Sequence, residues 1–178
     1  MKKARVILLI IALFVLFSGC SAGKDPYALA NDIKTHYNEM SEPSLTARVT
    51  ADYGDRLSEF TLALAGNEIT ILEPDEVSGI KARIADGGVS LVYSDAEVFS
   101  GAVTANGLSP VAALPFMLEC FRAGTVSSAW LVGDKLTVDY FISDTISLRA
   151  EFDAETLSPM AALLTEEGSR ALCAEFIN

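Results

Sequence analysis

Residues 45–72 read LTARVTADYGDRLSEFTLALAGNEITIL, and this stretch decides the fold. From Leu45 to Tyr53 apolar residues alternate with polar ones, a period of two that is typical of a strand with one buried and one wet face. Gly54-Asp55 and Gly66-Asn67 divide the stretch into three such runs. Short glycine-containing connections between alternating runs are a strong hairpin signal. The stretch therefore predicts three antiparallel strands that follow one another in sequence order.

The same alternation continues through most of the chain. Further runs lie at 80–84, 89–93, 126–132, 136–142, 146–152, 159–165 and 170–176. We therefore expect about ten strands in one antiparallel meander, and a sheet of so many twisted strands tends to curl. The predicted fold class is α+β, mainly β: a strongly curved half-barrel sheet with two helices covering its concave face.

The two helices are predicted from their first residues, because each begins with a capping residue followed by proline. Asp25-Pro26 opens the first helix, and Ser109-Pro110 opens the second, which ends at Gly124. Apolar residues recur on one face of each helix: Leu29, Ile33, Tyr37 and Met40 in the first, and Val111, Leu114, Met117, Leu118 and Phe121 in the second.

The first 20 residues have the order of a bacterial lipoprotein signal. Three basic residues precede an apolar run at 6–17, whose 12 residues are too few to span a bilayer, which needs ~20. Phe17-Ser18-Gly19-Cys20 resembles the lipobox, in which a diacylglyceryl group is attached to the cysteine sulfur and cleavage leaves that cysteine first. The alternative is an ordinary secretory signal in which Cys20 is incidental.

On this interpretation the chain has three parts: a signal peptide at 1–19, a tether at 20–24 and one domain at 25–178. The lipid on Cys20 would hold the domain to the extracytoplasmic face of the cell membrane. We expect no cofactor apart from this covalent lipid.

The charge balance excludes one class of partner. The whole chain has 13 basic and 24 acidic residues, and the signal peptide contains Lys2, Lys3 and Arg5 but no acidic residue. The mature protein therefore has 10 basic residues and a net charge of −14. Such a body is repelled by nucleic acid and by anionic headgroups. We expect no nucleic-acid binding.

The sequence contains little that could support catalysis. His36 is the only histidine, and it is expected to be partly buried and structural. Glu73, Asp75 and Glu76 surround a proline and predict a solvated turn, since a calcium loop needs an Asp-x-Asp-x-Asp-Gly spacing that is missing here. No nucleophile elbow, phosphate loop or dinucleotide fingerprint is present. We therefore predict no catalytic residues, no metal site and no enzyme.

The remaining cysteines and the tryptophan allow two interpretations each. Outside the cytoplasm Cys120 and Cys173 could form a disulfide, or they could stay as separate half-buried thiols. Trp130 is expected to pack beneath a helix, because tryptophan is usually buried, although an exposed Trp130 would mark a binding site.

Three soft motifs carry a family resemblance. They are the Asp-x-x-Thr-x-x-Pro turn within 152–159, the segment from Glu73-Pro74 to Gly79-Ile80, and the final Glu-Phe-x-Asn. With the predicted lipidation and meander, residues 25–178 resemble the LolA/LolB/RseB-like superfamily of envelope lipoproteins and lipoprotein carriers. The resemblance is to divergent members in Gram-positive bacteria, including germination-associated lipoproteins, and it implies a curved half-barrel whose mouth is closed by helices.

The departures from that family argue against a lipoprotein shuttle. Carriers have a basic Arg-Pro and aromatic segment after their early strands, whereas this chain has acidic residues around Pro74, in ILEPD at 71–75. A soluble carrier would also lack Cys20.

The leading hypothesis is a non-enzymatic lipoprotein that binds a lipid or acyl chain in the concavity of the sheet. The candidate cavity residues are Phe60, Leu62, Leu91, Met117 and Phe121. The alternative is a protein-interaction module, its cavity collapsed into core, that docks on and regulates an envelope or spore-cortex enzyme. A structural lipoprotein without a ligand is a third possibility. An empty concave volume would favour the first hypothesis, and an exposed apolar patch would favour the second.

Overall fold

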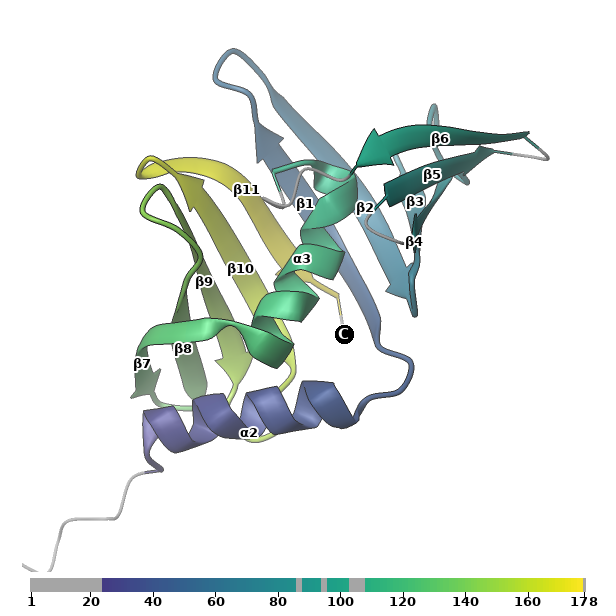
Figure 1. The fold of residues 1–178 in the computed structure, drawn as a ribbon. Helices are drawn as coiled ribbons and strands as arrows, with labels where there is room; N and C mark the ends of the chain where they lie inside the picture. The colour runs from purple at the N-terminus through teal and green to yellow at the C-terminus, as the bar shows by residue number, and fades with distance from the viewer. Residues whose placement is uncertain (1–23, 86–87, 94–95, 103–107, 178) are drawn as a thin grey trace, which may run out of the picture.

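A computed structural model describes residues 24–85, 88–93, 96–102 and 108–177 (Figure 1). The signal peptide, Cys20 and most of the tether lie outside these residues. The elements in chain order are α2 (Pro26–Glu39), β1 (Ser44–Asp52), β2 (Leu57–Ala65), β3 (Glu68–Glu73), β4 (Lys81–Ala85), β5 (Gly88–Tyr93), β6 (Ala96–Ala102), α3 (Pro110–Ala123), β7 (Thr125–Val132), β8 (Lys135–Phe141), β9 (Ile146–Asp153), β10 (Pro159–Glu166) and β11 (Ser169–Phe176).

All the described strands form one antiparallel sheet in the order β6-β5-β4-β3-β2-β1-β11-β10-β9-β8-β7. Two meanders, β1 to β6 and β7 to β11, are joined by the pairing of β1 with β11, in which Ala51 lies opposite Leu172. The chain passes from one outer strand to the other through α3. The predicted half-barrel of class α+β is confirmed, and eleven strands are described where about ten are expected.

One strand, β6, has no counterpart in the runs predicted from sequence. Its residues read AEVFSGA, in which two apolar residues are adjacent and a glycine follows, so the period of two is lost. It pairs with β5 in the structure. Here the partner strand, and not the local pattern, determines the conformation.

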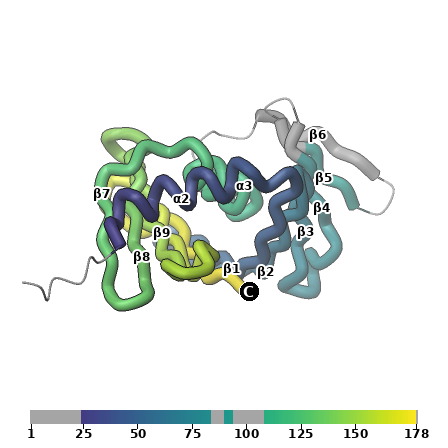
Figure 2. Tube along the Cα trace, turned by 90° about the horizontal axis from the view of Figure 1, so that it is seen from below, coloured from purple at the N-terminus to yellow at the C-terminus, as the bar shows by residue number. Residues whose placement is uncertain are grey.

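The two helices pack on the concave face of the sheet. Figure 2 shows α2 and α3 inside the curve of the sheet, with α3 packed against β1 and β2 and α2 packed against α3, β7 and β8. Because strand side chains alternate, β1, β2 and β8 each present a buried apolar set to these helices. Eight residues of α3 are buried: Pro110, Ala112, Ala113, Leu114, Met117, Leu118, Cys120 and Phe121.

Phe121 is the centre of an aromatic cluster between α3 and the sheet. Its ring centroid lies 4.9 Å from that of Phe152, 5.4 Å from Tyr37 and 6.1 Å from Tyr140. These distances are typical of aromatic pairs in cores. The hydroxyl group of Tyr140 is buried and has no hydrogen-bond partner among the described residues. The cluster is thus almost entirely apolar in its interactions.

The last turn of α3 holds the end of α2. Arg122 donates hydrogen bonds from Nε to the Tyr37 carbonyl at 2.9 Å and from its guanidinium to the Met40 carbonyl at 3.2 Å. In return, the Asn38 side chain donates to the Arg122 carbonyl at 3.0 Å. A cation at the carboxyl end of a helix satisfies free carbonyls there. These hydrogen bonds join the end of α2 to the last turn of α3.

The convex face of β7, β8 and β9 is polar and partly exposed. Asp139 accepts two hydrogen bonds from Arg149, at 2.7 and 3.0 Å, and one from the Ser128 hydroxyl at 3.0 Å. Trp130 belongs to this face, since it lies opposite Thr137, and the Arg149 guanidinium sits 5.1 Å from its ring centre. The expectation that Trp130 packs beneath a helix is therefore wrong. It lies on an edge strand with 36% of its surface exposed.

Candidate functional site

The predicted cavity residues all lie on or above the concave face, but they differ in exposure. Leu62 and Met117 have no exposed surface, and Phe121 retains 1%. Phe60 and Leu91 are partly buried and pack against the same hydrophobic core. The structure thus brings the five residues into one apolar cluster, in which three are core side chains that border no solvent.

The described residues contain no arrangement typical of a metal or acid–base centre. Within residues 24–85, 88–93, 96–102 and 108–177, no three His, Cys, Asp or Glu side chains could hold a metal ion together. His36 is partly buried. Its ring centroid lies 5.1 Å from that of Tyr37, and the two rings are in an edge-to-face arrangement. Glu73 accepts a hydrogen bond from the Thr61 hydroxyl. In the same part of the chain, no helix has the length and apolar character needed to cross a bilayer.

The two thiols in the domain are free. Cys120 is buried on α3 and Cys173 is half-buried on β11. Burial raises the pKa of the Cys120 thiol to about 12, with a smaller contribution from nearby Glu119, and burial also raises the pKa of Cys173. Both thiols are therefore protonated at neutral pH and are poor nucleophiles.

A cleft lies between two hairpins at one end of the strands. It has a volume of about 440 Å³. Its lining comes from the end of β1, the β1–β2 turn, the end of β10 and the start of β11: Asp52, Tyr53, Gly54, Glu166, Ser169, Arg170 and Ala171. Tyr53 is half-exposed, and Leu57 is 67% exposed where β2 begins. The sequence pattern places Tyr53 on the inward face of a strand. In the structure β1 ends one residue earlier, at Asp52, so the ring is free of the core.

Local hydrogen bonds shape this cleft. The Asp52 carboxylate accepts the Gly54 N–H at 2.8 Å, and Gly54 has a φ of +83°, which favours glycine. The Tyr53 N–H donates to the Arg56 carbonyl at 3.0 Å, while the Arg56 guanidinium lies 5.7 Å from the Tyr53 ring centre. The turn therefore presents a tyrosine and an arginine side by side.

The neighbouring hairpins are tied to each other at the same end. The Glu167 N–H, in the β10–β11 turn, donates to the Thr145 carbonyl in the β8–β9 turn at 2.7 Å. We call residues 52–57, 141–146 and 166–171 the tip surface. It contains five acidic and two basic residues, a net charge of −3, together with the exposed side chains of Tyr53, Leu57 and Phe141.

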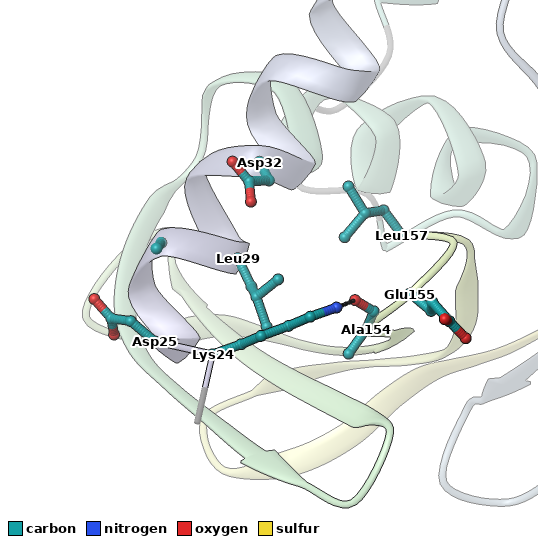
Figure 3. A pocket seen from close by; sticks show the side chains of 8 residues that line it. Lys24, Asp25, Leu29, Asp32, Ala154, Glu155 and Leu157 are labelled. Carbon is teal, nitrogen blue, oxygen red and sulfur yellow. Dashed lines mark hydrogen bonds between the residues drawn. The ribbon is translucent and has the colours of Figure 1, made fainter. Parts of the chain in front are cut away.

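The opposite end of the strands receives the start of the domain. Lys24 donates a hydrogen bond from Nζ to the Ala154 carbonyl at 3.2 Å, next to an open pocket of about 390 Å³ (Figure 3). Its lining includes Asp25, the residue that caps the start of α2, Asp32 of α2, and Leu157 from the β9–β10 turn. We call Lys24, the β7–β8 turn and the β9–β10 turn the tether end.

The Asp-x-x-Thr-x-x-Pro motif builds the β9–β10 turn. The Asp153 carboxylate accepts the N–H groups of Glu155 and Thr156 at 3.0 and 2.7 Å, and the Thr156 hydroxyl at 3.0 Å. These hydrogen bonds, led by that of the Thr156 N–H, lower the pKa of Asp153. The motif is therefore structural: it shapes the turn on which Lys24 rests.

The fold resembles those of several solved structures, although no family model and no curated protein matches the chain. A structure of the CwlD amidase from Clostridioides difficile in complex with the GerS lipoprotein is matched at 11% identity and a TM-score of 0.48, over 87% of this chain and 95% of that chain. A domain described as a putative outer membrane lipoprotein-sorting protein, from Vibrio parahaemolyticus, is matched at 11% identity and a TM-score of 0.48. The match covers 84% of this chain and 88% of that chain. The LolA superfamily protein NE2245 from Nitrosomonas europaea is matched at 8% identity and a TM-score of 0.43, over 84% of this chain and 91% of that chain. These similarities concern the fold alone.

Proposed function

We propose that this chain is a membrane-tethered, non-enzymatic docking protein of the cell envelope, which presents the tip surface to a basic protein partner. The observation that supports this proposal is the composition of the tip surface. Exposed Tyr53 and Leu57 stand beside a cleft within a region of net charge −3. Exposed aromatic and aliphatic groups within a charged rim are typical of protein interfaces.

The position of the tip surface supports the same function. β10 runs from the tether end to the tip surface over eight residues, about 27 Å at ~3.4 Å per residue. Figure 1 shows α2 and the tip hairpins at opposite ends of the strands. A lipid on Cys20 would therefore leave the tip surface pointing away from the membrane, where a partner can reach it.

Charge favours a basic partner. The mature body has a net charge of −14, and the tip surface contributes to it. Opposite charge accelerates the encounter of two proteins and selects against wrong partners. The acidic groups around the cleft would thus attract an arginine- or lysine-rich surface, and Tyr53 and Leu57 would supply the apolar contact.

An acyl chain in the concavity is the second candidate. Phe60 and Leu91 pack against the core but are only partly buried, which supports this function. The full burial of Leu62, Met117 and Phe121 makes it the weaker candidate, because a ligand chamber needs empty volume beside its lining.

Photo-crosslinking of the full chain in the cells that produce it tests both candidates. A photoreactive amino acid would replace Leu57 on the tip surface, Leu91 on the concave face or Thr35, an exposed residue of α2. We expect protein adducts of one discrete mass from position 57 only, and fewer of them as salt is added. Lipid adducts from position 91, without protein adducts from position 57, would replace docking by the second candidate.

A further inference from the structure

We infer that the tether end itself rests on the membrane, with Trp130 and Val132 of β7 in the headgroup region as a second contact beside the lipid. This inference depends on the lipid anchor at Cys20 that is part of the proposed function. It adds a lipid-binding surface on the folded domain, which the anchor alone does not require.

The length of the tether limits how far the domain can stand from the bilayer. Cys20 and Lys24 are four residues apart, and an extended chain covers at most ~3.6 Å per residue, so their Cα atoms are separated by no more than ~14 Å. Lys24 is bound to the folded domain through the Ala154 carbonyl. Whatever surrounds Lys24 is therefore held within reach of the headgroups, whose layer is several ångströms thick on each side.

A series of hydrogen bonds and strand pairs leads from Lys24 to the end of β7. The Ala154 N–H donates to the Asp134 carbonyl at 2.8 Å, which joins the β9–β10 turn to the β7–β8 turn. Val132 lies opposite Lys135 across that hairpin. Figure 1 shows the end of β7 beside the start of α2, and α2 packs against β7. The last residues of β7 thus belong to the end of the domain that the tether holds down.

Exposed apolar side chains gather at this end. Val132 is 66% exposed, Trp130 is 36% exposed, and Tyr27 and Met160 are about half-exposed. Tyr27 lies in the first turn of α2, and Met160 follows the β9–β10 turn. Tryptophan and tyrosine favour the membrane interface, because their rings combine an apolar body with a polar group. β7 also contains no charged residue.

The charges at the tether end indicate which lipid surface fits. Lys135 pairs with Glu151 at 3.0 Å, and the carboxylate of Asp153 is occupied by its own turn. Asp134 and Glu155 are exposed acidic residues at this end. Acidic groups are repelled by anionic headgroups. We therefore assign the contact to a zwitterionic surface such as phosphatidylcholine or phosphatidylethanolamine.

Trp130 offers a direct measurement, because it is the only tryptophan in the chain. The lipidated full chain would be reconstituted on phosphatidylcholine vesicles with ordinary or brominated acyl chains, since bromine quenches a nearby indole at short range. We expect a blue shift of the emission and at least a two-fold loss of intensity on brominated vesicles. Emission that is equal on both kinds of vesicle, from protein that floats with them, would overturn the inference.

Flotation separates this inference from the anchor. If the wild-type chain does not float with vesicles, the proposed anchor fails and the inference fails with it. If wild type floats and Cys20→Ser does not, the anchor stands, and the quenching alone decides whether the domain rests on the bilayer. Two variants test whether the quenching depends on contact between the domain and the bilayer. Val132→Asp, or an insertion of 15 glycine and serine residues before Lys24, should abolish quenching while flotation continues.

Phe141→Asp is the matched control for Val132→Asp. Phe141 is a half-exposed residue on the same convex face, but it lies at the tip surface. This variant should retain the full quenching of the wild type. Equal losses in the two aspartate variants would show a general disturbance of the domain and would contradict the assignment of the contact to the tether end.

Discussion

The concave and convex faces of the sheet come from the same alternating strands, yet they are stabilised differently. On β8 and β9 the concave side chains Leu136, Val138 and Leu148 have no exposed surface and lie under the helices. On the convex side of the same strands Asp139 and Arg149 form a partly exposed ion pair. Apolar burial contributes ~25 cal/mol per Å², whereas an exposed ion pair contributes under ~1 kcal/mol. The comparison teaches that the stability of the domain resides on its concave face.

Truncating the centre of the concave cluster should have the largest effect. Phe121→Ala removes a ring that contacts Tyr37, Tyr140 and Phe152, so we expect a loss of ~3–5 kcal/mol in the free energy of unfolding. Urea denaturation followed by circular dichroism measures it. Phe141→Ala, half-exposed on the convex face, should cost under ~1 kcal/mol. Similar losses in the two variants would contradict the conclusion that the concave face contributes most of the stability.

A single methyl group at the end of α3 should have the next largest effect. A Cβ at Gly124 would lie 2.5 Å from the Cys120 carbonyl oxygen and 2.7 Å from Cδ1 of Tyr140, so helix or ring must shift. We expect Gly124→Ala to cost ~1–3 kcal/mol by overpacking. Differential scanning fluorimetry would report a lower Tm. Thr125→Ala, at the exposed next residue, serves as control and should leave Tm nearly unchanged.

The ion pair between Asp139 and Arg149 on the convex face should contribute less to the free energy of unfolding, and only above acidic pH. Hydrogen bonds from Arg149, and then Ser128, lower the pKa of Asp139. Because its pKa is lower in the folded than in the unfolded chain, ionised Asp139 stabilises the fold above about pH 4, and this contribution is lost as the pH falls through the folded pKa. Asp139→Asn should therefore cost under ~1 kcal/mol at neutral pH and nothing near pH 2. Urea midpoints at both pH values test this prediction; an equal cost at both would contradict it.

The smallest effect is expected from the buried hydroxyl group of Tyr140. This group has no hydrogen-bond partner among the described residues, and a buried polar group without one costs free energy. Tyr140→Phe should therefore leave the stability unchanged or raise it by up to ~1 kcal/mol. Tyr37→Phe is the matched variant, because the Tyr37 hydroxyl donates to the Leu157 carbonyl at 3.5 Å, and it should be neutral or slightly destabilising. A loss of stability in Tyr140→Phe would show that its hydroxyl has a partner.

The sequence predicts the strands well where a buried face is regular, and less well at edges and ends. The runs at 45–53 and 68–72 match β1 and β3 to within one residue, because their inward residues alternate without interruption. β6 is missed because its pattern lacks a period of two. Trp130 is misplaced because hydrophobicity does not tell which of the two faces of an edge strand a residue joins.

The candidate site is less predictable than the fold. Phe60, Leu62, Leu91, Met117 and Phe121 belong to one hydrophobic core or pack against it, but the sequence pattern does not reveal how much of the concave space α3 occupies. The tip surface is absent from the sequence prediction, since it is assembled from three turns that are far apart in the chain. The sequence feature that could have indicated the tip surface is a pair of apolar residues, Tyr53 and Leu57, on either side of a glycine-containing turn.

By itself the sequence determined the local elements of this protein. A period of two in the strands, Asp25-Pro26 and Ser109-Pro110 before the helices, and short turns such as Gly133-Asp134 act between neighbours in the chain, so they can be recognised from the pattern. Only the tertiary structure decided which strands lie at the edges of the sheet, that β1 pairs with β11, and how much of the concave face the helices cover. These features depend on packing between residues far apart in the chain, such as Ala51 with Leu172, and that packing is settled only when the whole sheet has formed.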